Sequence, residues 1–167
     1  MITNLEQLYI DQLRDLYSAE TQLIAALPEM AANATDEGLR DAFNHHLDET
    51  RSQRARLQEI FGFHGIAAEG EDCDAMRGLV KEANKHVANT QQGSVRDAVL
   101  IASGNRVEHY EIAAYGVARA FAECLGHDED VKLLTKSIEE EAAADDTLTK
   151  IASGGLFRDG VNEAAAH

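Results

Sequence analysis

The sequence predicts an all-α protein, a bundle of four long helices with one short extra helix between the second and third. Three observations lead to this fold class. The 167-residue chain contains a single proline, its apolar residues recur at helical spacing over long stretches, and strand-like runs of β-branched or aromatic residues are few. A chain of this length can bury a substantial core as one domain without disulfides.

The first long helix is expected from Thr3 to about Ala34. Thr3 and Glu6 stand three residues apart, which is the spacing of a capping box at a helix start. The segment LEQLYIDQLRDLYSAETQLIAALPEM then repeats apolar residues with a helical period. Pro28 is expected to bend this helix, because proline removes a backbone hydrogen bond and clashes with the preceding turn.

The second long helix is expected over residues 36–61 and ends at GFHG, where glycine can adopt the left-handed conformation common after helices. The segment IAAEGED follows as a loop, and CDAMRGLVKEANKHV predicts a short amphipathic helix. The segment NTQQGS then interrupts the helical pattern. This long crossover separates the two halves of the predicted bundle.

The third long helix is expected from Ser94 to about residue 125, and Asp97 gives its start a second capping pattern. The fourth is expected from about Asp128 to Ser153, where two consecutive glycines end it. Both helices are long enough to run the full length of the bundle.

Residues 1–154 are therefore expected to form the bundle domain, and residues 155–167 a flexible C-terminal tail. The tail has little periodicity, which is typical of a mobile chain end. Of its residues, only Leu156 and Phe157 are expected to dock on the bundle.

Composition and charge exclude several functional classes. The formal net charge is -15, so phosphates would be repelled and cations are the more natural ligands. Cys73 and Cys124 are far apart and lack the spacing of a thiolate metal site, which predicts two reduced, buried thiols. The N-terminus lacks a secretory pattern, and no apolar run approaches the roughly 20 residues that span a bilayer. We expect a cytoplasmic protein that binds neither nucleic acid nor a membrane.

Acidic side chains fall on the apolar faces of the first two long helices. With 100° of rotation per residue, Glu20 lies at the centre of the apolar stripe of the first helix. On the second helix, Glu49 and Gln53 share a face with Leu57, and His46 lies on the same side. Three polar side chains of the second helix are thus expected to point inward.

The third and fourth long helices show the same feature. Glu108 aligns with the apolar residues of its helix, and Glu111 is displaced by about 60° but still faces inward. On the fourth helix, Glu141 and Asp145 fall among apolar residues, whereas Glu140 is expected to point elsewhere. Each long helix therefore carries at least one carboxylate on its core face.

Buried carboxylates need compensation, because an unpaired buried charge costs several kcal/mol even after relaxation. Arg56 stands at the edge of its helix's stripe, and Arg14 and Arg106 stand off theirs, so no cationic side chain occupies a stripe centre. Metal ions would neutralise the cluster, and oxygen-rich sites suit iron or manganese. The alternative is a metal-free bundle in which the carboxylates are protonated or paired.

This arrangement resembles ferritin-like dimetal carboxylate proteins, which place one inward Glu on each of two helices and a pair of ligands on each of the other two. More narrowly, the chain resembles the YciE/YciF family of bacterial stress-associated ferritin-like proteins from about Asn4 to Ala152. The blocks that carry this resemblance are YSAETQL, HHLDETRSQ, CDAMRGLVKEAN, VRDAVLIA, VEHYEIAAYG and EEEAAADDTL.

The resemblance implies a set of metal ligands. A ferritin would have histidine three residues after Glu49 and after Glu141, where this chain has Ser52 and Ala144, so the next position is taken to supply the ligand. His46 competes with Gln53 for this role on the second helix. The implied ligands are Glu20, Glu49, Gln53, Glu108, Glu111, Glu141 and Asp145.

By the same resemblance, Glu49 and Glu141 bridge two metals, and Glu20 and Glu108 cap them. Tyr17 and Tyr115 either donate hydrogen bonds to ligating carboxylates or simply fill the core. Of the two, Tyr17 is favoured as a donor. We leave Glu82 of the short helix outside the ligand set.

The resemblance implies two metal ions, with iron first and manganese second, and a homodimer. Such a centre is compatible with oxidase, peroxidase or catalase-like chemistry on oxygen or peroxide. A second hypothesis keeps the metals but makes the bundle a structural or interaction protein without turnover, in which they only stabilise the fold.

Overall fold

The computed structural model describes residues 1–69, 72–155 and 158–166, and over these residues the chain folds as an all-α bundle. The predicted fold class is thereby confirmed. Two-residue strands pair antiparallel at the C-terminal side, with Gly154 opposite Asp159. In chain order the elements are α1 (Leu5–Asn33), α2 (Glu37–Phe63), α3 (Asp74–Ala88), α4 (Ser94–Leu125), α5 (Asp128–Ser153), β1 (Gly154–Gly155), β2 (Arg158–Asp159) and α6 (Val161–Ala165).

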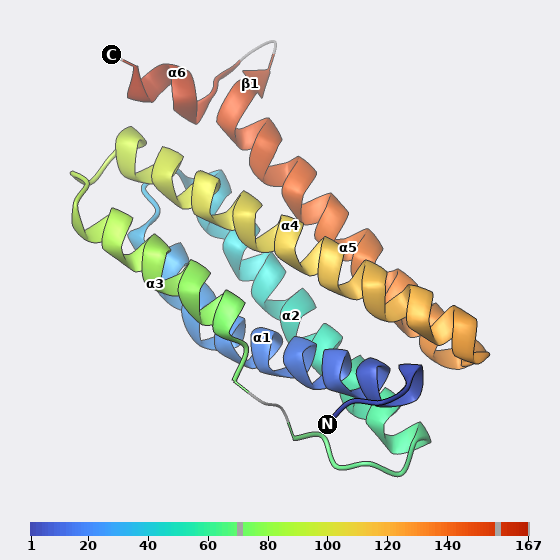
Figure 1. Cartoon of the computed structure of the whole chain (residues 1–167). Coiled ribbons are helices and arrows are strands. Elements are labelled where there is room, and N and C mark those ends of the chain that lie inside the picture. Colours follow the sequence, from blue (N-terminus) through green and yellow to red (C-terminus); the bar gives the residue numbers. More distant parts are fainter. Residues whose placement is uncertain (70–71, 156–157, 167) are drawn as a thin grey trace.

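The long helices α1, α2, α4 and α5 form the bundle (Figure 1). The short helix α3 lies in the crossover between α2 and α4 and packs against α1 and α4. The α1–α2 turn lies at one end of the bundle, and the α4–α5 turn lies at the other. No helix in the described part of the chain is long and apolar enough to cross a bilayer.

Two details of α1 differ from the sequence prediction. The N-cap is Asn4, whose side chain accepts a hydrogen bond of 2.9 Å from the Gln7 amide, so the predicted Thr3 and Glu6 pair is wrong by one residue. Thr3 instead donates its backbone N–H to the Gln7 side chain at 2.9 Å. The helix also continues through Pro28, five residues before its end.

The predicted capping pattern of Ser94 and Asp97 at the start of α4 is wrong, because Asp97 binds the turn between α1 and α2 instead. Gly93, which has no side chain to cap with, is the N-cap of α4. Asp97 is buried and accepts hydrogen bonds from the backbone N–H groups of Thr35 at 2.7 Å and Asp36 at 2.9 Å. Asp97 therefore ties α4 to the turn between α1 and α2.

The C-terminal tail has more structure than the sequence predicts. Val161, at the start of α6, is buried in the core of the bundle. Gly160 allows this return, because a Cβ atom there would collide with the backbone at the end of α5. The predicted docking residues, Leu156 and Phe157, lie outside the described residues, and the flexibility of the tail stays a prediction.

The apolar core divides into two clusters along the bundle. One contains Leu23, Leu39 and Leu100 near the α1–α2 turn, and the other contains Leu13 and Leu57 near the opposite end. The acidic residues selected from the sequence lie between these clusters along α2, α4 and α5, and Glu20 of α1 lies next to their boundary. The core is therefore interrupted by a polar layer at mid-length.

The two cysteines differ in their surroundings. Cys73 is buried, as predicted, but Cys124 is exposed near the end of α4, so the prediction of two buried thiols is wrong for Cys124. Both are free thiols.

Candidate metal centre

The polar layer brings four ligand-type side chains together from three helices. His46 of α2, Glu108 and Glu111 of α4 and Glu141 of α5 each offer one ligand atom, and these atoms lie within 4.8 Å of one another. All four residues are buried. The helical repeat explains the pair on α4, because residues three apart share one face. We call these four residues the inner cluster.

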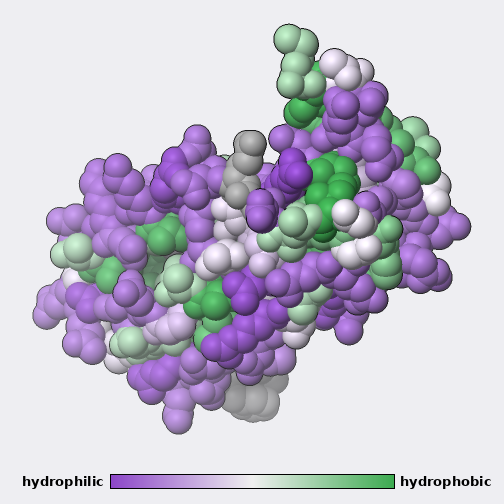
Figure 2. All heavy atoms as spheres, turned by 90° about the horizontal axis from the view of Figure 1, so that it is seen from below, coloured by the Kyte–Doolittle hydropathy of each residue, from purple (hydrophilic) through white to green (hydrophobic). Residues whose placement is uncertain are grey.

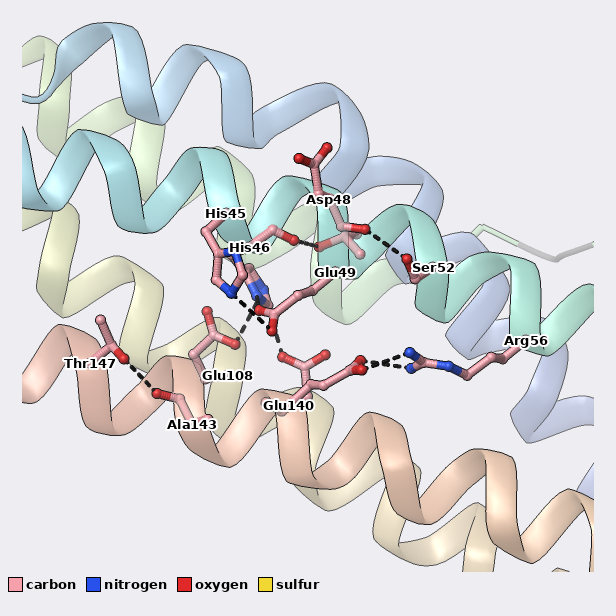
Figure 3. A network of polar contacts seen from close by, with 12 residues as sticks. His45, His46, Asp48, Glu49, Ser52, Arg56, Glu108, Glu140, Ala143 and Thr147 are labelled. Atoms are coloured by element: carbon pink, nitrogen blue, oxygen red, sulfur yellow. Dashed lines mark hydrogen bonds and ion pairs between the residues drawn. The ribbon is translucent and has the colours of Figure 1, made fainter.

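His46 stands at the centre of the inner cluster. Its Nε2 atom lies 3.4 Å from Glu108 Oε2 and 3.6 Å from Glu141 Oε2, and its Nδ1 atom lies 3.5 Å from Glu49 Oε2. Figure 3 shows the imidazole between Glu49 and Glu108. From the sequence, His46 and Gln53 were alternative metal ligands on this helix. The structure places His46 among the inner carboxylates.

Glu49 lies at the edge of the layer, with 22 % of its side chain exposed. The His45 Nε2 atom is 3.3 Å from its Oε1 atom, while His46 contacts its Oε2 atom (Figure 3). The hydrogen bond from His46 holds the pKa of Glu49 below its usual value, against the opposing effect of burial. Glu49 is therefore a partly exposed carboxylate that favours its ionised form at the edge of the layer.

Glu20 closes the layer from α1 and is fully buried. The Tyr115 hydroxyl donates a hydrogen bond to Glu20 Oε1. Tyr17, which the sequence analysis favoured for this role, instead accepts a hydrogen bond of 3.1 Å from Gln58 Nε2. The preference for Tyr17 is wrong, because its position on α1 directs its hydroxyl toward α2 and away from the carboxylates.

The remaining two sequence candidates occupy different surroundings. Gln53 is fully buried one turn beyond Glu49. Asp145 is 23 % exposed and accepts a hydrogen bond of 2.7 Å from Asn105 Nδ2, with His109 Nε2 at 3.4 Å from the same oxygen. Asp145 thus lies at the margin of the layer, already engaged by two side chains of α4.

One residue beside the layer was missed. Glu140 was expected to point elsewhere, but only 18 % of its side chain is exposed. Its carboxylate receives two hydrogen bonds of 2.6 Å from the Arg56 guanidinium (Figure 3). Arg56 was the sequence signal for this pair, because a cation at the edge of an apolar stripe needs an acidic partner on a neighbouring helix.

Burial and mutual repulsion dominate the electrostatics of the layer. Burial raises the pKa of Glu20, Glu108 and Glu111 well above the usual value, and the charge of Glu141 raises each of them further. Burial also raises the pKa of Glu141. For His46, burial lowers the pKa, but the hydrogen bond with Glu49 and the nearby carboxylates outweigh it and raise the value.

A cavity of about 90 Å³ lies beside this layer and is partly open to solvent. His46, Glu49 and Glu108 line its inner part. The rest of the lining combines small side chains, such as Ala42 of α2 and Ala143 of α5, with the larger Phe43 and Leu148. A small molecule or ion could reach the inner cluster along this path.

Comparisons with known proteins agree with the fold. The family described as "Domain of unknown function (DUF892)" matches residues 4–166. Protein YciF of Escherichia coli (strain K12) is 40 % identical over 161 residues, which are 96 % of this chain and 97 % of YciF. These matches confirm the relationship to YciF expected from the sequence blocks.

Two solved structures are similar over most of their length. The structure of YcfI from Rhodopseudomonas palustris superposes with a TM-score of 0.89 at 42 % identity, covering 90 % of this chain and 96 % of that one. The structure of the E. coli stress protein YciF gives a TM-score of 0.86 at 41 % identity, covering 89 % and 94 %. By sequence and by structure, the chain belongs to the DUF892 family.

Proposed function

We propose that the chain is a dinuclear iron or manganese carboxylate protein of the ferritin-like class that handles peroxide, oxygen or iron. The observation that carries this proposal is the inner cluster, in which carboxylates from separate helices converge at mid-length. No apolar or hydrogen-bonding requirement of the fold calls for such an arrangement. Bound cations give it a physical reason, because they remove the repulsion between buried negative charges.

The donor atoms fit metal ions. Among the described residues, both oxygens of Glu111 and of Glu141 are buried without a hydrogen-bond partner, as are Glu20 Oε2 and Glu108 Oε2. Buried polar atoms in folded proteins nearly always have a hydrogen-bond partner or a bound ion. A group of buried carboxylate oxygens without hydrogen-bond partners therefore supports bound cations at this place. A set rich in carboxylate oxygens with one imidazole suits iron or manganese.

The chain's residues would divide the work as follows. Glu20, Glu49, Glu108, Glu111, Glu141 and His46 would hold the metal ions, with Gln53 and Asp145 as further candidates. A bound pair of reduced metals would supply electrons to oxygen or peroxide. Tyr115 would orient Glu20 through its hydrogen bond, which is how groups around metal ligands fix their geometry.

The comparison with YciF supports a biological setting. YciF of E. coli is described as a stress protein, and the match covers nearly the whole of both chains. We extend this setting to the present chain, in which peroxide or free iron would be the substrate during stress.

A second candidate function is a structural or interaction bundle whose metals only stabilise the fold. It is favoured by the suggested structural role of YcfI, which is 42 % identical to this chain. The two proposals differ in turnover, because both predict bound metal and only the first predicts consumption of a substrate.

The test begins with metal content. Protein purified without chelator is expected to hold two iron or manganese ions per chain, measured by elemental analysis and located by anomalous diffraction at the two absorption edges. Glu49→Ala with Glu141→Ala should abolish this binding. The matched control is Glu59→Ala with Glu139→Ala, which removes exposed glutamates from the same two helices. A Glu49/Glu141 double variant that still holds two metals would contradict the proposed ligands.

Turnover then separates the two functions. Iron-loaded protein is expected to consume peroxide, or oxygen with ferrous iron, and the Glu49→Ala and Glu141→Ala double variant is not. Wild-type protein that holds two metals but consumes neither substrate supports the structural function.

A further inference from the structure

A second group of ligand-type side chains lies at the bundle end that holds the α4–α5 turn. Glu6 of α1, His64 after α2 and His127 before α5 each offer one atom, and these atoms lie within 4.8 Å of one another. His64 and Glu49 are 15 residues apart on α2 and its cap, so this end cluster lies about 22 Å along the helix axis from the inner cluster. It does not depend on the proposed function.

The three side chains face one another at short distances. His127 Nε2 lies 3.2 Å from Glu6 Oε2, and His64 Nδ1 lies 3.9 Å from Glu6 Oε1. The two imidazole rings meet edge to face with centroids 4.7 Å apart. Tetrahedral zinc with bonds of about 2.0–2.1 Å holds its ligand atoms roughly 3.3 Å apart, so these positions need little movement to close around an ion.

A buried carboxylate orients the ring of His64. Asp130 is buried, and its Oδ2 atom lies 2.7 Å from His64 Nε2 and accepts a hydrogen bond of 2.8 Å from the Tyr9 hydroxyl. This contact engages Nε2 and leaves Nδ1, the ring nitrogen that lies 3.9 Å from Glu6 Oε1, to bind an ion. A carboxylate behind a ligating histidine is the usual support of a protein metal site.

The backbone and a buried aromatic ring hold the two histidines in place. Each stands beside a glycine in the left-handed region, His64 before Gly65 with φ of 65° and His127 after Gly126 with φ of 77°. The Tyr9 ring packs against both imidazoles, with centroid distances of 6.0 Å to His64 and 5.7 Å to His127. The imidazoles are thus positioned before any ion arrives.

Solvent can reach the cluster. The exposed fractions of the side chains are 46 % for Glu6, 14 % for His64 and 25 % for His127. Asp128 and Glu129 lie in the first turn of α5 beside His127 and add negative charge there. These features favour the arrival of a divalent cation and leave one coordination position open to water.

We propose that Glu6, His64 and His127 form a separate mononuclear site for a divalent transition-metal ion of the zinc class, supported by Asp130. Two imidazole nitrogens and one carboxylate suit this class, whereas the inner cluster offers mainly oxygen. An ion there joins the start of α1, the end of α2 and the start of α5. The bound ion therefore also cross-links three helices and stabilises this end of the bundle.

The test measures zinc binding by competition with a chromophoric chelator, on metal-free full-length protein. His64→Gln with His127→Gln is expected to bind one zinc ion fewer per chain than the wild type. His86→Gln, which alters a histidine on α3 away from both clusters, should match the wild type. Asp130→Asn should keep the stoichiometry and weaken this site by about 10–100-fold, the usual cost of removing support from a metal ligand. Equal zinc stoichiometry and affinity in the wild type and the double histidine variant would overturn the site.

Circular dichroism shows whether the double histidine variant folds. If it does not fold, a second measurement on the wild type tests the site. In the wild type labelled with ¹⁵N-histidine, zinc is expected to shift the imidazole resonances of His64 and His127, assigned with the single variant His127→Gln. Resonances of both histidines that stay unchanged at saturating zinc would overturn the proposal. Because the inner cluster is intact in these experiments, loss of this site leaves the proposed dinuclear centre untouched.

Discussion

At the scale of single residues, the polar layer is a set of carboxylates held in positions that disfavour their charge. Glu111 is the extreme case, because it is fully buried and both its oxygens are without a hydrogen-bond partner among the described residues. Such a group either binds a cation or takes up a proton. The metal-free protein must therefore fold with protons on its inner carboxylates, and its stability must depend on pH.

The first prediction is that metal-free protein loses stability as pH rises from about 5.5 to 8. The pKa values of Glu20, Glu108, Glu111 and Glu141 are raised in the folded state, so between the unfolded value near 4.5 and the folded value the native chain holds more protons. The free energy of unfolding then falls with pH. The raised pKa of His46 acts in the same direction, since its contribution is lost as pH rises through the folded value. Urea unfolding in the presence of chelator measures the effect.

A matched pair of variants assigns this dependence to the layer. Glu111→Gln removes one titrating group and should flatten the slope by up to about 1.4 kcal/mol per pH unit. Glu59→Gln, on the exposed side of α2, should leave the slope unchanged. The lowered pKa of Glu49 has the opposite sign, and its effect falls below this pH range. A slope that is the same in both variants would show that Glu111 is not the source.

At the scale of helices, each long element combines two periodic features. Its apolar residues supply the contacts above and below mid-length, and its acidic residue enters the polar layer between them. The connections then fix how the helices meet. Asp97 is the clearest case, because it accepts two backbone hydrogen bonds from the turn that joins α1 to α2.

The second prediction concerns this tie. Asp97→Ala removes the charged acceptor of two part-buried backbone hydrogen bonds from the α1–α2 turn, and the loss of hydrogen bonds to a charged group costs about 1–3 kcal/mol. The free energy of unfolding, measured by urea denaturation, should fall by this amount. The control is Asp146→Ala, which removes an exposed partner of Lys150 and should change stability by less than about 0.5 kcal/mol. Equal losses in the two variants would argue against the tie.

At the scale of the whole molecule, two apolar clusters enclose one polar layer, and the surface is strongly acidic. On the face shown in Figure 2, hydrophilic side chains predominate and hydrophobic ones form separate patches. The excess of negative charge attracts cations to both proposed metal sites, and salt screens this attraction.

The third prediction is that the chain forms a homodimer in solution, as its resemblance to the YciF relatives implies. Light scattering coupled to gel filtration should give twice the mass of one chain, at physiological salt and across a tenfold range of protein concentration. A mass of one chain throughout that range would contradict the dimer.

The helices and the inward direction of their acidic residues were predictable from the sequence, because the helical period of 3.6 residues is a local property of the chain. It placed Glu20, Glu108, Glu111 and Glu141 on core faces, and the structure buries all four. Their role as metal ligands stays a prediction.

Which side chains meet was settled by the packing of the helices against one another. It put His46 among the inner carboxylates, chose Tyr115 over Tyr17 as the donor to Glu20, and paired Glu140 with Arg56. It also assembled the cluster of Glu6, His64 and His127 from the ends of three helices that share no local pattern. The physical reason is that such meetings depend on the relative shift and crossing of packed helices, which the pattern within a single helix does not encode.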